Sequence, residues 1–173
     1  MKIINNFLSN VFIDKIINEN KELLYSDVWR SSLGWQKEII GSCGTVLIRD
    51  LNAEDKNLLK EALIAHNLIL ESENIELEAQ AYLWNRLSYI PWHSDKDDDD
   101  STRYAATLYL NNDWDDNWGG LFLYKKEGKI FGESPRYNKF VFNDKNYEHS
   151  TTILGTDAPI RQTIQLFWKK LSE

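Results

Sequence analysis

The sequence predicts a mainly β fold, an antiparallel sandwich or jelly roll, with helices in the N-terminal part. Apolar residues at helical spacing are confined to residues 1–70. From residue 75 onward, aromatic and β-branched residues come in short runs separated by Asn, Asp and Gly, which is the pattern of short strands. The long alternation of helices and strands that builds a parallel Rossmann sheet is missing, so we expect the strands to close on one another.

Length and composition favour a single domain over residues 1–173, with helical support over about 1–70 and a β core over about 75–170. The 173 residues are 42% hydrophobic, which is enough for an independent core. The formal net charge is −7, the sequence pI is about 5.0, and no sustained run of Lys and Arg occurs. Nucleic acid is therefore not an expected partner, because phosphate contacts need clustered cations.

Cysteine usage and hydropathy bear on the compartment. Cys43 is the only cysteine, which excludes an internal disulfide and a thiolate metal cage and favours a reducing compartment. The N-terminal residues lack the unbroken apolar stretch of a signal peptide. No later run reaches the roughly 18 apolar residues that a membrane span requires. We therefore expect a cytoplasmic protein without a membrane partner; its oligomeric state cannot be derived from these features.

Two amphipathic helices are expected before residue 70. The first covers residues 9–24, with Ser9 as its N-cap and apolar residues recurring at helical spacing. The second follows Asn52, which can cap it, and extends to about residue 67. Acidic residues in its first turn suit the positive end of the helix dipole.

About eight strands are expected in the whole chain, most of them after residue 75. The clearest are Glu78–Tyr89, Tyr104–Asn111, Gly120–Tyr124, Lys139–Asn143 and Arg161–Lys169, and weaker ones lie near 37–40, 45–49 and 150–154. Because these strands are short and few helices separate them, antiparallel pairing is expected throughout.

Three side chains of the β region form a candidate metal site: His93, Asp95 and His149. Alternate residues of an extended strand share a face, so His93 and Asp95 point the same way. His149 follows a glycine hairpin and a further strand, so a second β layer could bring it opposite His93. Two imidazoles and one carboxylate suit non-haem Fe(II). Zinc fits less well, because structural zinc prefers four protein ligands and hydrolytic zinc needs a separate general base.

Arg161 opens the most regular strand of the chain. A period of two places Arg161, Thr163 and Gln165 on one face, and the apolar residues Ile164, Leu166 and Trp168 on the other. A cation and a hydroxyl on the inner wall of a barrel are unfavourable unless an anion compensates them. A carboxylate is the natural partner of a guanidinium, so this strand predicts a carboxylate-binding site.

At these residues the sequence resembles the Fe(II)/2-oxoglutarate-dependent oxygenases, and within them the prolyl 4-hydroxylase-like branch. The matching segments are His93-Ser94-Asp95, Thr107–Asn111, Trp118–Leu121, His149 and Arg161-Gln162-Thr163. The segment Ile4–Ser9 is also similar to the family's lead-in to its first helix, so the resemblance covers nearly the whole chain.

The resemblance implies a double-stranded β-helix in which His93, Asp95 and His149 are the catalytic iron ligands. It also implies that Arg161 binds the distal carboxylate of the co-substrate 2-oxoglutarate, with Thr163 as a second contact. The reaction expected from the family consumes O2 and 2-oxoglutarate, releases succinate and CO2, and hydroxylates a substrate C–H bond, with ascorbate as an optional reductant. Hydroxylation is favoured over halogenation, because related halogenases have Ala or Gly in place of the acidic ligand.

The sequence departs from the family pattern near the co-substrate. Trp84 and Leu87 stand where many prolyl hydroxylases have Tyr and Gly. The usual tyrosine contact to 2-oxoglutarate is therefore open, with Tyr82 and Tyr109 as the two candidates. Many peptidyl prolyl hydroxylases also have Lys where this chain has Arg161, which weakens the substrate assignment and leaves the reaction class unchanged.

The substrate is the least determined feature. A prolyl or other residue in a peptide or protein is the first expectation, and a free amino acid or small metabolite is the alternative. The acidic run Asp97–Asp100 follows Asp95 and would favour a neutral or basic substrate if it lies at the mouth of the site; otherwise it is a solvated loop. A non-catalytic jelly-roll binding module is the alternative of another class, in which His93 and Asp95 are only polar strand residues.

Overall fold

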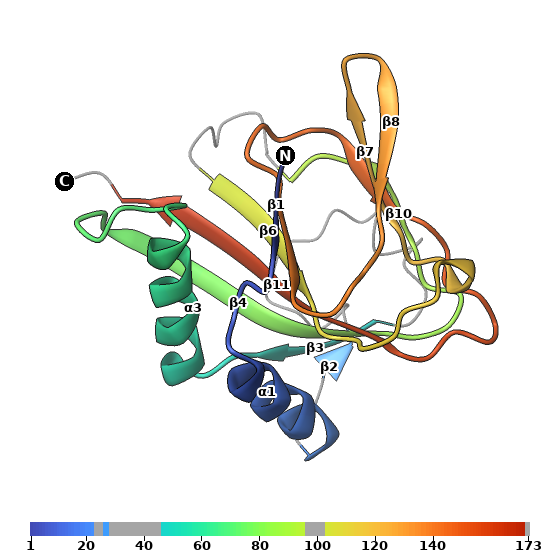
Figure 1. The fold of residues 1–173 in the computed structure, drawn as a ribbon, viewed down its shortest axis with the longest axis horizontal. Helices are drawn as coiled ribbons and strands as arrows, with labels where there is room; N and C mark the ends of the chain where they lie inside the picture. The colour runs from blue at the N-terminus through green and yellow to red at the C-terminus, as the bar shows by residue number, and fades with distance from the viewer. Residues whose placement is uncertain (23–25, 28–45, 96–102, 172–173) are drawn as a thin grey trace.

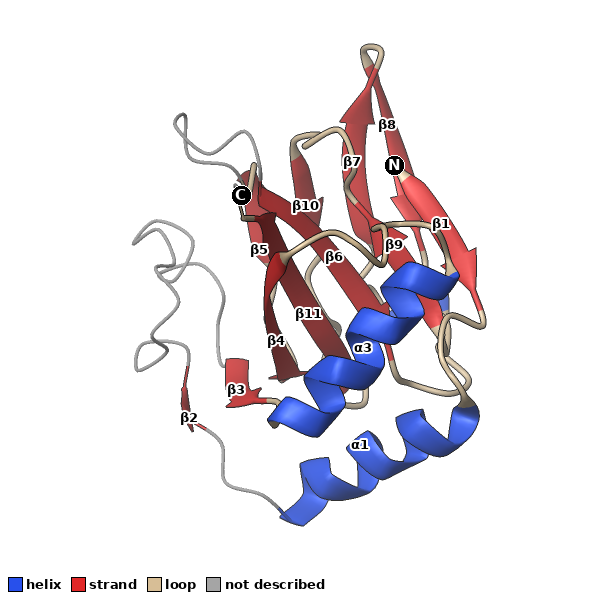
Figure 2. Cartoon of the chain, turned by 90° about the vertical axis from the view of Figure 1, so that its left-hand side faces the viewer, coloured by secondary structure: helices blue, strands red, loops and turns tan. Residues whose placement is uncertain are grey.

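The computed structural model describes residues 1–22, 26–27, 46–95 and 103–171 of the chain. These residues form two antiparallel sheets that face each other and two helices that pack on the outer face of the larger sheet (Figure 1). Figure 2 shows α3 (Ala53–Ala65) lying across the strands of that face and α1 (Asn10–Glu22) beside α3. The predicted strand near 37–40, Cys43 and the acidic run Asp97–Asp100 lie outside the described residues.

Every strand pair within the described residues is antiparallel. The larger sheet has, in spatial order, β1 (Lys2–Asn5), β9 (Lys139–Phe142), β6 (Arg103–Tyr109), β11 (Arg161–Lys170), β4 (Ile75–Trp84), β3 (Val46–Asp50) and β2 (Ser26–Asp27). The smaller sheet has β5 (Ile90–His93), β10 (His149–Thr151), β7 (Phe122–Lys126) and β8 (Lys129–Glu133). A single 3-10 turn, η2 (Asp116–Trp118), precedes β7 in this part of the chain.

The two predicted helices begin where their capping residues place them. The Ser9 hydroxyl accepts a hydrogen bond from the Phe12 amide at 3.3 Å, and the Asn52 side chain accepts one from the Asp55 amide at 2.9 Å. Each cap satisfies a backbone N–H that has no partner inside its own helix. The second helix ends at Ala65, and the following His66 amide still donates to the Ala62 carbonyl at 3.0 Å.

The alternation predicted for β11 is confirmed, and it separates the core into two parts. Ile164, Leu166 and Trp168 belong to a cluster that joins the larger sheet to α1 and α3. Arg161 and Thr163 are buried on the opposite face. That face looks toward the smaller sheet across two apolar clusters. Their members are Val46, Ile48, Tyr82, Trp84, Ile90, Trp114, Leu154 and Ala158 in one, and Tyr109, Phe122, Tyr124 and Val141 in the other.

The predicted strand Glu78–Tyr89 is wrong as a single element. The chain turns after Trp84 and enters the smaller sheet at Ile90. Leu87 adopts a φ of +66°, a left-handed conformation that glycine takes more easily, and its amide donates to the Leu154 carbonyl at 2.9 Å. Because of this corner, His93 lies in the smaller sheet and not in a continuation of β4.

Four strands within the described residues lie outside the predicted strand ranges; besides the two-residue β2 and the β5 that follows the corner, these are β1 and β8. The first, β1, lies within the stretch expected to be helical support, and it pairs with β9 along the edge of the larger sheet. The second, β8, forms a hairpin with β7 that projects from the body of the protein in Figure 1. Its turn residues Glu127 and Gly128 both have positive φ, as a two-residue hairpin loop requires. Because β8 is largely exposed, it lacks the apolar alternation that marks a buried strand.

A buried carboxylate links the two helices. Asp55 is fully buried in the first turn of α3, and the Lys15 ammonium of α1 lies 2.6 Å from its Oδ1. This hydrogen bond raises the pKa of Lys15, so the ammonium stays protonated at neutral pH. The ion pair therefore fixes α1 against α3.

We expect Lys15→Met to lower the free energy of unfolding by about 3 kcal/mol, because it leaves the buried Asp55 carboxylate without its partner. Urea unfolding followed by circular dichroism measures the change. Lys21→Met is the matched control, since Lys21 lies at an exposed position of the same helix, where its ammonium donates to Asn18. Equal stability of the two variants would contradict the assigned role of the pair, and Asp55→Asn should restore part of the loss in Lys15→Met.

Candidate active site

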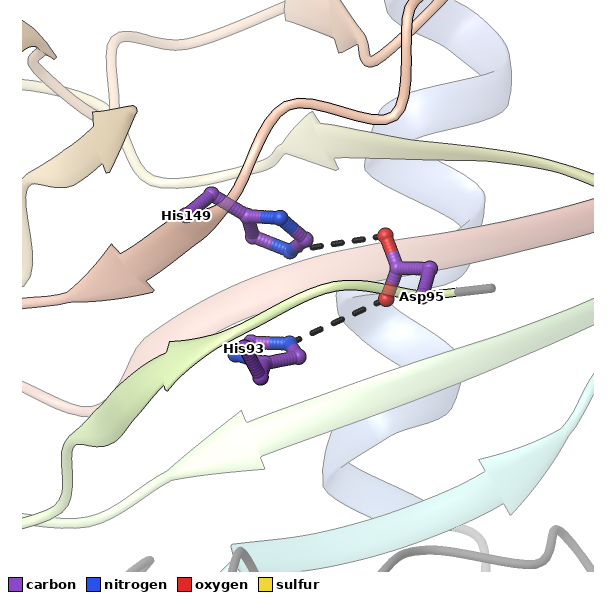
Figure 3. Close-up of side chains that lie close together, drawn as sticks. All are labelled: His93, Asp95 and His149. Atoms are coloured by element: carbon purple, nitrogen blue, oxygen red, sulfur yellow. Dashed lines mark ion pairs between the residues drawn. The ribbon is translucent and has the colours of Figure 1, made fainter. Parts of the chain in front are cut away.

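His93, Asp95 and His149 converge between the ends of two short strands. His93 is the last residue of β5, His149 is the first residue of β10, and the two are paired in register across the smaller sheet. Figure 3 shows the Asp95 carboxylate facing both imidazoles: Asp95 Oδ1 lies 3.8 Å from His93 Nε2, and Oδ2 lies 3.4 Å from His149 Nε2. One ligand atom from each residue falls within 4.8 Å of the others, which fits a single metal ion.

Both imidazoles are oriented in the same way by the backbone. His93 Nδ1 lies 2.8 Å from the Pro91 carbonyl oxygen, and His149 Nδ1 lies 3.0 Å from the Tyr147 carbonyl oxygen. When each Nδ1–H donates to its carbonyl, each Nε2 keeps a free lone pair directed toward Asp95. This is the tautomer that a metal-binding histidine needs.

The surroundings of His93 favour its neutral imidazole. Burial, followed by the charge of His149, lowers the pKa of His93, and Asp95 opposes the shift. The ring of Phe122 stacks on His149 with a centroid distance of 5.1 Å. Protons therefore compete weakly with a metal ion for His93 near neutral pH.

Arg161 lies in the interior with polar atoms that have no partner. Its side chain is fully buried between the rings of Trp84 and Tyr109, whose centroids are 5.4 and 5.1 Å from Cζ. Nε and Nη1 have no hydrogen-bond partner among the described residues. Burial lowers the pKa of Arg161, but a guanidinium stays charged in proteins. A buried cation with free N–H groups fits the carboxylate predicted from the sequence.

Gly120 makes room for this side chain. An added Cβ at Gly120 would lie 3.0 Å from Arg161 Cδ and 3.3 Å from the ring of Trp114, and Gly120 has a φ of +66°. Gly119 is equally constrained, because its added Cβ would lie 2.1 Å from the Ile153 carbonyl oxygen. The paired glycines of the sequence therefore serve close packing as well as the turn.

Thr163, Tyr82 and Tyr109 lie side by side across three strands, one step along the sheet from Arg161. The Thr163 hydroxyl accepts a hydrogen bond from Trp84 Nε1 at 3.1 Å, and the Tyr82 hydroxyl donates to Gln80 at 3.2 Å. The Tyr109 hydroxyl is buried and has no partner among the described residues. Burial raises the pKa of Tyr109, so its hydroxyl stays protonated and can donate.

Sequence reasoning assigned no role to three polar side chains on the next step of the same inner face. Gln80, Gln165 and Thr107 are register partners on β4, β11 and β6. Gln80 Nε2 donates to Asp50 at 2.7 Å, and the Thr107 hydroxyl donates to Gln165 Oε1 at 2.8 Å. The alternation that singled out Arg161 and Thr163 already reached Gln165, and extending it across the neighbouring strands could have found the others.

The sequence profile of the 2OG-Fe(II) oxygenase superfamily matches residues 77–168, which contain all seven predicted site residues. The chain belongs to this superfamily. It is thus an oxygenase that uses Fe(II) and 2-oxoglutarate, which confirms the enzyme class and the cofactors expected from the sequence. A search of curated proteins found no match.

Solved structures confirm the jelly-roll fold of this oxygenase. A prolyl-4-hydroxylase from Pseudomonas putida superposes with a TM-score of 0.72 at 15% identity, covering 99% of this chain and 92% of that one. A prolyl hydroxylase from Trichoplax adhaerens, in complex with a hypoxia inducible factor peptide fragment, gives a TM-score of 0.71 at 18% identity, with coverages of 97% and 82%. HygX from Streptomyces hygroscopicus, with nickel, 2-oxoglutarate and hygromycin B bound, gives 0.70 at 10% identity, with coverages of 96% and 81%.

Neither α1 nor α3, the helices within the described residues, combines the length and the apolar character needed to cross a membrane.

Proposed function

We propose that this oxygenase hydroxylates a C–H bond of a prolyl or other residue in a peptide or protein, at a centre held by His93, Asp95 and His149. The observation that carries the proposal is the convergence of the three side chains, whose ligand atoms lie within 4.8 Å of one another. Fe(II) with bound 2-oxoglutarate supplies the O2-derived oxidising power for C–H cleavage, with succinate and CO2 as co-products. Asp95 supplies the carboxylate ligand, which favours hydroxylation over halogenation.

Arg161 is the proposed anchor of 2-oxoglutarate. Nε and Nη1, which have no hydrogen-bond partner among the described residues, would bind the distal carboxylate in the buried interior. Tyr109 is the better placed of the two tyrosines, because its ring lies against Arg161 and its hydroxyl has no partner among the described residues. Thr163 is the register partner of Tyr109 on the neighbouring strand. The Tyr82 hydroxyl donates a hydrogen bond to Gln80 and thereby supports the inner face of the larger sheet.

The polar side chains on the inner face of the larger sheet favour a substrate that carries amide groups. Gln80, Gln165 and Thr107 lie one step beyond Thr163 along the strands, on the face that also bears Arg161. Side-chain amides and hydroxyls can both donate to and accept from a peptide backbone. The prolyl hydroxylase of similar fold with a bound peptide fragment supports this reading.

A small-molecule substrate is the second candidate. The same polar face suits a hydroxyl-rich or amine-rich compound, and HygX, which has a similar fold, was solved with hygromycin B. The two candidates differ in what the enzyme must contact: backbone amides on both sides of the reacting residue, or one compact molecule.

Succinate production across a substrate panel tests the proposal. The panel contains prolyl peptides, the same peptides with neutral, basic or acidic neighbours, free amino acids and hygromycin B, and mass spectrometry locates the added oxygen. We expect the largest stimulation of succinate release from peptides. Stimulation by free amino acids or hygromycin B alone would favour the small-molecule alternative.

An anaerobic titration with Fe(II) and 2-oxoglutarate is the control for this panel. Chelation should produce a visible charge-transfer absorption that depends on both additions. A folded protein that shows neither this absorption nor succinate release would support the non-catalytic binding module instead.

A further inference from the structure

The loop that leads into His149 is closed by one buried asparagine. Asn143 follows β9 and is 6% exposed. Its Nδ2 donates to the Tyr147 carbonyl oxygen at 2.9 Å, and its Oδ1 accepts from the Tyr147 amide at 2.8 Å. The side chain therefore holds both polar groups of the Tyr147 backbone.

The Tyr147 carbonyl is also the group that orients His149. His149 Nδ1 lies 3.0 Å from the Tyr147 oxygen and 3.3 Å from Asn143 Nδ2. A carbonyl oxygen has two lone pairs, so it can accept from the asparagine and from the imidazole together. Asn143 thus fixes the position of the acceptor that selects the His149 tautomer.

The carbonyl that orients His93 needs no supporting side chain. Its acceptor, the Pro91 carbonyl, lies inside β5, whereas Tyr147 precedes the first residue of β10. A carbonyl within a strand is positioned by the strand itself, and a carbonyl in a loop needs a separate support. In this protein Asn143, at the start of the same loop, provides that support.

We propose that Asn143 is a positioning residue for the metal centre, acting through the Tyr147 carbonyl on the orientation and tautomer of His149. The inference rests on the proposed function, because it takes His149 to be a metal ligand. Without Asn143, the ring can rotate or carry its proton on Nε2, and both changes remove the lone pair that faces Asp95.

The test replaces Asn143 with Leu, whose side chain has the same branching at Cγ and forms no hydrogen bond. Co(II) binding is measured by competition with a chelator, and its visible spectrum reports the ligand geometry. We expect Asn143→Leu to weaken Co(II) binding by roughly 10- to 100-fold, as for other groups that orient metal ligands, and to change the spectrum. Asn143→Ser, which keeps a hydroxyl donor, should give an intermediate affinity and decides the question if the Leu variant does not fold.

Asn138, at the other end of β9, offers a matched control. It is also buried, and it holds the Leu8 backbone in both directions, with hydrogen bonds of 2.9 and 2.7 Å. Asn138→Ala should lower the melting temperature and leave Co(II) affinity and the spectrum unchanged. A purely structural role for Asn143 would make the two variants behave alike in all three measurements.

His149→Ala separates the failure of this inference from the failure of the proposed centre. If His149→Ala loses Co(II) and Asn143→Leu and Asn143→Ser bind it like the wild type with the same spectrum, the role assigned to Asn143 is wrong and the centre stands. If His149→Ala also binds Co(II) like the wild type, the assignment of His149 as a ligand is wrong, and the role of Asn143 falls with it. In the metal-free protein, 15N NMR of the imidazoles should show His149 protonated at Nδ1 in the wild type and a tautomer mixture in Asn143→Leu.

Discussion

Asp95→Ala is expected to abolish hydroxylation and to weaken metal binding by more than the roughly 10- to 100-fold seen when outer-shell partners are removed. Asp95 carries the negative charge of the set, and its two oxygens face His93 Nε2 and His149 Nε2 at 3.8 and 3.4 Å. Removing it leaves two imidazoles whose ring centroids are 4.2 Å apart, without a carboxylate between them. Anaerobic Fe(II) titration and succinate release measure the two effects.

Glu148→Gln is the control for this variant. Glu148 is adjacent to His149 in sequence, but its side chain is 46% exposed and pairs with Lys125 at 2.9 Å. Loss of this carboxylate should leave metal binding and turnover unchanged. Wild-type Fe(II) affinity in Asp95→Ala would show that the carboxylate is not a ligand.

Arg161→Ala should leave the fold intact and raise the 2-oxoglutarate requirement steeply. Removing one partner of a buried charge pair costs about 2 to 5 kcal/mol, which corresponds to roughly 30-fold to several thousand-fold in affinity. The fold should survive, because without an anion Arg161 is itself a buried charge, two of whose nitrogens have no partner in the described part of the chain. The dependence of succinate release on 2-oxoglutarate concentration measures the change.

A second measurement excludes misfolding as the cause. With Mn(II) present, 2-oxoglutarate should raise the melting temperature of the wild type and leave that of Arg161→Ala unchanged, because only the bound state is stabilised. Arg161→Lys should recover part of the affinity, since Lys lacks the bidentate fork. Arg136→Ala, which removes a half-exposed arginine paired with Asp116, should behave like the wild type. A titration of Arg161→Ala that overlays the wild type would show that another cation holds the carboxylate.

Local sequence patterns predicted the parts of the fold that are determined locally. Ser9 and Asn52 cap the helices as expected, because capping depends on residues three positions apart. The alternation of β11 predicted the buried position of Arg161, because alternation in a strand depends only on residues two positions apart. The corner at Leu87 could not be predicted, because a leucine with positive φ is held there by Leu154, which is distant in sequence.

In the candidate site, too, the residues that stand in local sequence patterns could be predicted, and those that depend on distant contacts could not. His93, Asp95 and Arg161 stand in short patterns that point to their chemistry, and the structure brings the first two together with His149. Asn143 carries no such pattern, because an asparagine after a strand is ordinary turn chemistry until its contact with Tyr147 is known. Gln80 and Thr107 gain meaning only from their register beside Gln165.

The pairing of His93 with His149 has a consequence for the energetics of the smaller sheet. The strand β5 has four residues, and its register with β10 consists of two residue pairs with an irregularity between His149 and Thr151. An ion held by both histidines would act as a cross-link that closes the long chain segment between them, much as a disulfide does. Because the unfolded chain does not bring these side chains together, metal affinity would appear directly as folding stability. The metal would then hold the two strands together as well as serve the reaction.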